Sequence, residues 1–121
     1  MTRYKAITEK DSKQEMLTKF FQNEIRRRDD AALTALLKTP SGRWFLMRLL
    51  DNSYVLGQCF TGNSTTFYNE GKREVGLQVL RDITRLGVKA VKLKQTAELE
   101  YIEFQAKARE LAEDYAERET E

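Results

Sequence analysis

Apolar side chains are densest in the stretch from Thr39 to Leu50, TPSGRWFLMRLL, where six large apolar residues fall within twelve positions. Thr39 suits the N-cap of a helix, and Pro40 suits its first position, where a missing N–H costs nothing. The apolar side chains would point nearly all the way round that helix, and such a helix needs cover on most faces. We therefore expect a buried central helix over residues 40–51, with Trp44 in the core.

The chain before this stretch predicts two helices separated by a break. The basic run 26–28 would end the first helix, because cations suit the negative end of a helix dipole. Asp29 or Asp30 would then cap a short second helix over 31–38. The first helix, over residues 12–28, is indicated by apolar residues three and four positions apart: Leu17, Phe20, Phe21 and Ile25.

After the central helix, a polar run TGNSTT leads into a helical pattern that continues to Leu86. Asn63 or Ser64 suits the N-cap of this helix. Gly71 and Gly76 lie inside it, and each costs roughly 1 kcal/mol relative to alanine. We expect the central helix to approach closely across one of the two glycines and so offset that cost.

Gly87 predicts a helix end, and an unbroken pattern from Val88 to about Arg118 predicts the longest helix of the chain. At 1.5 Å per residue this helix would be about 45 Å long, whereas a compact body of this size is about 25–30 Å across. Its end would therefore project beyond the body or pack on a neighbouring subunit. The alternative is that it folds back along the first helix. Its apolar residues recur at 4-3-4-3-4 spacing, as in a helix-packing seam: Ala97, Tyr101, Phe104, Ala108, Leu111 and Tyr115.

Together these patterns predict an all-α fold, a small helical bundle of four or five helices with a long C-terminal helix over 88–118. One proline, six glycines and 33% charged residues agree with a mainly helical chain. A length of 121 residues fits a single helical domain over 1–121. Residues 1–11 show no periodicity and would be a disordered arm unless a partner binds them.

The residue types that usually carry catalysis are scarce. Histidine is absent and cysteine occurs once, which excludes the usual zinc, haem and nucleophile–histidine sites. TGNST lacks the glycine–lysine pair of a P-loop. Glu98, Glu100 and Glu103 do not share one helix face, as a metal site would require. We therefore expect no enzyme, no catalytic residues, no cofactor and no metal.

The net charge of +2 conceals an uneven distribution. Residues 98–121 contain nine acids and three bases, which leaves 18 bases and 10 acids in residues 1–97. Such a basic body either contacts phosphate or acidic protein, or is a solvated surface. No apolar run approaches the roughly 18 residues that span a bilayer, and the first residues contain no apolar leader. We expect a location in the cytoplasm and no membrane partner.

Candidate contacts to phosphate or to a partner lie on the central helix and on the helix after it. Trp44 and Tyr68 lie close to them in sequence, and aromatic rings beside cations often hold single-stranded nucleic acid. In the alternative interpretation the arginine stems lie over the core and Trp44 is buried. The candidate residues are Arg43, Arg48, Lys72 and Arg73, with Asn63 and Ser64 at a helix N-terminus that could hold an anion.

Residues 36–80 resemble a family of small proteins encoded by tailed bacteriophages, typified by one from a Bordetella podophage. The resemblance rests on two blocks and on their separation, TPSGRWFLMRLL at 39–50 and FTGNSTTFYNEGKREVGLQVL at 60–80. It covers a little over a third of the chain. It implies a phage origin among the virion-building genes and no established enzymatic activity, and it supplies no functional residues.

From the resemblance and from the lack of catalytic residues we expect a non-enzymatic phage structural or assembly accessory protein. It would act by protein–protein contact in the virion head or neck, with other virion proteins or with further copies of itself as partners. Its location would be the host cytoplasm during assembly, and the virion. The alternative is a nucleic-acid-binding factor for DNA packaging or gene control, against which the acidic segment 98–121 argues by repelling phosphate.

Overall fold

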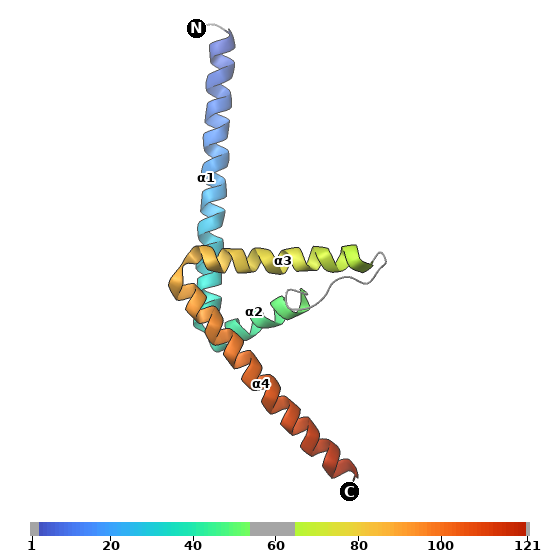
Figure 1. The fold of residues 1–121 in the computed structure, drawn as a ribbon. Helices are drawn as coiled ribbons and strands as arrows, with labels where there is room; N and C mark the ends of the chain where they lie inside the picture. The colour runs from blue at the N-terminus through green and yellow to red at the C-terminus, as the bar shows by residue number, and fades with distance from the viewer. Residues whose placement is uncertain (1–2, 54–64, 121) are drawn as a thin grey trace. The chain divides into compact units, whose positions relative to one another are not determined.

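The computed structural model of the chain describes residues 3–53 and 65–120. These residues form four helices and no strand, as Figure 1 shows. The prediction of an all-α fold with a long C-terminal helix is therefore confirmed. The helices are α1 (Arg3–Lys38), α2 (Pro40–Asn52), α3 (Thr65–Leu86) and α4 (Val88–Thr120).

The chain divides into two compact units, Met1–Ala32 and Leu33–Glu121. The first contains most of α1, and the second contains the last residues of α1 together with α2, α3 and α4. The single domain expected over 1–121 stays a prediction. Among the described helices, none combines the length with the apolar character that a bilayer-spanning segment requires.

Helix α1 is continuous from Arg3 to Lys38, so the predicted break at Asp29 or Asp30 is wrong. The same helix includes residues 3–11, most of the segment in which the sequence shows no periodicity. The reason in both places is that residues 3–38 contain no proline and no glycine. An aspartate can cap a helix, but it does not end the preceding one when good helix formers such as alanine follow.

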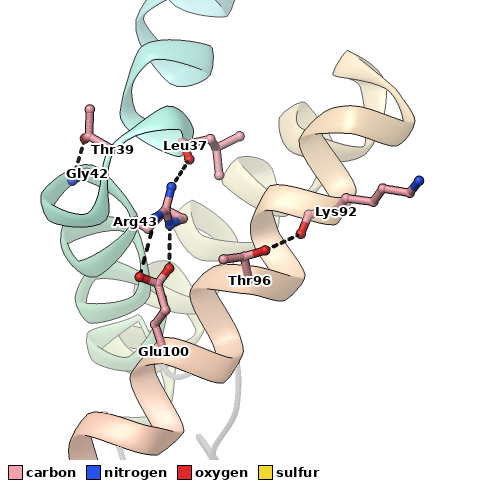
Figure 2. Close-up of polar contacts among 7 residues, drawn as sticks. All are labelled: Leu37, Thr39, Gly42, Arg43, Lys92, Thr96 and Glu100. Atoms are coloured by element: carbon pink, nitrogen blue, oxygen red, sulfur yellow. Dashed lines mark hydrogen bonds and ion pairs between the residues drawn. The ribbon is translucent and has the colours of Figure 1, made fainter.

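The start of α2 is confirmed at Pro40. Thr39 has extended backbone angles, φ −116° and ψ 146°, and its Oγ1 accepts the Gly42 N–H at 3.0 Å (Figure 2). A Cβ on Gly42 would lie 2.1 Å from the carbonyl oxygen of Leu36, so glycine allows the first turn of α2 to pass close to the end of α1. Ser53 follows the last residue of α2 as its C-cap, and its backbone N–H donates to the Leu49 carbonyl at 3.0 Å.

The core of the unit Leu33–Glu121 consists of two neighbouring clusters, because α2 and α3 both pack against α4 and also meet one another (Figure 1). Each cluster joins a stripe of α2 to small or aromatic residues of α4. Phe45, by contrast, is 59% exposed. The first cluster is Leu37, Leu46, Ile83 and Ala90, and the second is Met47, Leu50, Ala97 and Tyr101.

The prediction that Trp44 lies in the core is wrong, because 40% of its surface is exposed. Helix α2 is covered along one stripe rather than on most faces, since α3 and α4 approach it from neighbouring directions. Gly71 is exposed and no atom lies within 4 Å of a Cβ built on it, so the close approach expected there is not found. Gly76 is buried. Gly87, with φ +107°, forms the predicted turn between α3 and α4.

Candidate functional site

The predicted seam on α4 has two parts with different surroundings. Its first two residues, Ala97 and Tyr101, are buried against α2, with 3% and 5% of their surfaces exposed. The remaining four residues are exposed, and the large ones among them expose 55–66% of their surfaces. Figure 1 shows this part of α4 continuing past α2. We call these four residues the outer row: Phe104, Ala108, Leu111 and Tyr115.

Aromatic packing connects the outer row to α2. The Trp44 ring lies 5.2 Å from the Tyr101 ring, at an interplanar angle of 53°. It also lies 4.8 Å from the Phe104 ring in a nearly edge-on arrangement, at 69°. Such tilted contacts are favourable for aromatic rings. Trp44 therefore packs against Phe104, the first residue of the outer row, and links it to α2.

A polar network lies beside this aromatic cluster. The Arg48 guanidinium donates to the Tyr101 hydroxyl at 3.1 Å, and that hydroxyl donates to Asp51 Oδ2 at 2.5 Å. Arg48 and Asp51 also form an ion pair at 3.7 Å. Burial of Tyr101, and after it the hydrogen bond to Asp51, raise the pKa of the hydroxyl above its usual 10.0. The hydroxyl is therefore protonated at neutral pH and serves as a donor that joins α2 to α4.

An ion pair between Arg43 and Glu100 joins α2 to α4 further toward the α1 end. The Arg43 Nε lies 2.5 Å from Glu100 Oε1, and its second terminal nitrogen donates to Glu100 Oε2 at 3.4 Å. The other terminal nitrogen donates to the Leu37 carbonyl at 2.9 Å, as Figure 2 shows. Only 12% of the Arg43 side chain is exposed. Arg43 therefore connects the end of α1, α2 and α4.

The residues predicted to contact phosphate do not share one environment. Arg43 and Arg48 each contact a carboxylate, which offsets part of the charge that they would offer to phosphate. On α3, the Lys72 ammonium lies 4.5 Å from the centre of the Tyr68 ring. Arg73 is half-buried on the same helix. The predicted N-cap residues, Asn63 and Ser64, lie outside the described residues. Phosphate binding by any of these six residues stays a prediction.

A hollow of about 450 Å³ lies among α2, α3 and α4. Met47, Leu50 and Tyr101 line its apolar wall, and Lys94 and Glu98, paired at 3.2 Å, lie at its edge. No sequence pattern could have predicted it, because its lining comes from three helices that are distant in the chain. Within the described ranges, no group of three or more histidine, cysteine or acidic residues is placed to hold a metal ion.

A second exposed apolar surface lies on α1, in the unit Met1–Ala32. Five large side chains there expose between 47% and 69% of their surfaces. At 100° per residue they share one half of the helix with four exposed cations, at positions 10, 13, 27 and 28, and with two exposed acids, Glu9 and Glu24. Arg27 pairs with Glu24 at 3.4 Å. We call the five residues the α1 apolar face: Met16, Leu17, Phe20, Phe21 and Ile25.

The sequence alone indicated the residues of these two surfaces except Met16, but not which of them are exposed. Periodicity identifies the apolar side of a helix and says nothing of what covers it. The polar contacts around Arg43 and Tyr101 were missed altogether, because Arg43 and Glu100 are 57 positions apart. The only feature of the sequence that hinted at a buried polar contact was an arginine beside apolar residues on the central helix.

Part of the chain matches a known protein family. The family described as Bbp19-like phage protein matches residues 33–98. This range contains the residues 36–80 that carry the resemblance to small phage proteins, and it includes α2, α3 and most of the buried part of α4. No curated protein and no solved structure matches the chain. The outer row and the α1 apolar face both lie outside the matched range.

Proposed function

This chain belongs to the Bbp19-like phage protein family, and we propose that it is a non-enzymatic structural or assembly accessory protein of a phage. It acts by helix-mediated contact with other proteins in the virion head or neck. The observation that carries this proposal is the α1 apolar face, where five large apolar side chains are exposed on one helix. Contiguous exposed apolar surface of this kind is typical of protein-contact sites.

The chemistry of the α1 apolar face favours a protein partner over nucleic acid. Two phenylalanines and three aliphatic side chains form its centre, and the cations are distributed around them. Fully burying one such side chain contributes about 1.5–3 kcal/mol, from which the cost of association is subtracted. A partner with an apolar groove and an acidic rim satisfies both the centre and the cations.

A phage gene replacement tests this proposal. The matched variants are Phe21→Asp, on the α1 apolar face, and Gln22→Asp, an exposed position on the opposite side of α1. Mass spectrometry of purified virions and assembly intermediates measures the copy number of each. We expect a fixed copy number for the natural chain and for Gln22→Asp, and a loss of at least tenfold for Phe21→Asp. Absence of the natural chain from both virions and intermediates would overturn the proposal.

The same purified chain tests the nucleic-acid alternative. If the basic body binds DNA, affinity should fall by about 10³-fold between about 50 and 200 mM salt for roughly six phosphate contacts. Lys72→Ala should then reduce the slope of that fall by about one contact. This result, together with absence from particles, would identify a nucleic-acid-binding factor. Weak binding with a shallow slope agrees with the role in assembly.

A further inference from the structure

We propose that the outer row of α4 pairs with the outer row of a second copy of this chain, in the antiparallel orientation. This self-association is separate from the partner of the α1 apolar face and does not require it. The outer row continues the stripe that α2 already covers at Ala97 and Tyr101. The second copy would therefore extend an existing helix-packing surface rather than begin a new one.

The spacing of the outer row determines the register of the pair. In an antiparallel pair, Phe104 lies opposite Tyr115 of the second copy, and Ala108 lies opposite Leu111 of the second copy. Each exposed position is then used once, and the small Ala108 makes room for the large Leu111. A shift of one heptad toward the N-terminus would require Tyr101, which is already buried against α2. A shift in the other direction would leave Phe104 uncovered.

Charge distinguishes the antiparallel pair from the parallel one. Lys107 and Asp114, both exposed, lie on the same flank of the outer row, and Glu119 lies on the other flank. In the antiparallel pair Lys107 faces Asp114 of the second copy, and the two-fold symmetry repeats this attraction. In a parallel pair Asp114 would instead face Glu119 of the second copy, which places like charges together. Within the span of the outer row, the antiparallel orientation therefore has two attractions, which the parallel orientation lacks.

At one end of the outer row, the rings of Trp44 and Phe104 together form an exposed aromatic surface that a second copy could cover. The Trp44 ring packs edge-on against Phe104 and is itself 40% exposed. The end of α4 from the second copy would cover both rings at once. Because the row is shorter than three heptads, the pair is small, and we expect a dissociation constant on the order of tens of micromolar.

Charge reversal in the full chain tests the register. Sedimentation velocity over about 1–300 µM measures the dissociation constant of the dimer for each variant. Lys107→Glu and Asp114→Lys should each weaken the dimer about tenfold, because each replaces two attractions by two repulsions. The double variant restores opposite charges and should return to within about threefold of the natural chain. Arg109→Glu makes the same charge change at an exposed position away from the row and is the matched control. It should alter the dissociation constant of the dimer by less than about threefold.

Leu111→Asp supplies an independent variant and should abolish the dimer over the same range. Circular dichroism shows whether every variant keeps its helices, so that loss of the dimer is not confused with unfolding. A monomer at all concentrations of the natural chain overturns the proposal. So does a dimer that Leu111→Asp leaves intact, or a double variant that is weaker than both single variants.

Discussion

Gly42 gives the sharpest test of how the helices pack. Replacing it by alanine should lower the free energy of unfolding, whereas the same change at an exposed position inside a helix should raise it. Inside an exposed helix, alanine is better than glycine by about 1 kcal/mol. At Gly42, however, a Cβ would lie 2.1 Å from the Leu36 carbonyl oxygen and 2.7 Å from the Leu36 carbonyl carbon and Cα. These are backbone atoms and cannot rotate away. The first turn of α2 would have to move relative to the end of α1.

The size of the effect follows from that displacement. A movement of roughly 1 Å is needed before the contact becomes tolerable, and it would loosen the packing of Leu37 and Leu46, which are 1% and 4% exposed. Overpacking of this kind costs about 1–3 kcal/mol, and the strain exceeds the gain in helix propensity. We expect Gly42→Ala to lower the free energy of unfolding by about 1–3 kcal/mol. At Gly71, where no atom lies within 4 Å, the same change should raise it by about 0.5–1 kcal/mol.

Urea unfolding followed by circular dichroism measures both variants against the natural chain. The two substitutions have the same chemistry and the same intrinsic propensity, so the difference between them isolates the contact with Leu36. If Gly42→Ala stabilises the chain as much as Gly71→Ala does, α2 does not pass the end of α1 at the distance described. If both variants destabilise the chain equally, the close contact with Leu36 is likewise not what distinguishes Gly42 from Gly71.

Two further predictions concern the core and its polar network. Trp44→Ala should cost about 1–3 kcal/mol of stability, less than the roughly 2–5 kcal/mol expected for Leu37→Ala, because Trp44 is 40% exposed and Leu37 is 1% exposed; equal losses in urea unfolding would contradict the half-exposed position of the ring. The raised pKa of Tyr101 predicts stabilisation that is fully present below about pH 10 and is lost as the pH rises through the folded-state pKa. Tyr101→Phe should therefore lose less stability between about pH 9 and 11 than the natural chain. If urea unfolding gives both chains the same dependence of stability on pH in this range, the Tyr101 hydroxyl is not buried and bonded to Asp51.

The boundaries of α2 and α4 could be predicted because local chemistry determines them. Thr39 and Pro40 cap and start α2 whatever surrounds them, and Gly87 can adopt its positive φ with little cost. The continuity of α1 could not be predicted in the same way. Asp29 and Asp30 resemble a cap, but a cap acts only where another feature stops the helix, and here none does.

The sequence could not show which residues of the candidate surfaces are exposed, for a different reason. The seam on α4 was correctly identified as apolar, but whether a position such as Tyr101 or Leu111 is covered depends on where α2 crosses α4. That crossing is set by contacts between distant segments, including the pair of Arg43 with Glu100. The prediction that Trp44 lies in the core failed for the same reason. The apolar character of a side chain does not show which helix lies beside it.

Tyr101 is the last buried residue in the described part of α4, and this has an evolutionary consequence. From residue 106 onward every described residue of α4 is exposed, so the fold places little constraint on which amino acids occupy that segment. Selection there can act almost entirely through whatever binds it. Phages with related chains could therefore change the sequence at the end of α4 while the packing of α2, α3 and the start of α4 stays the same.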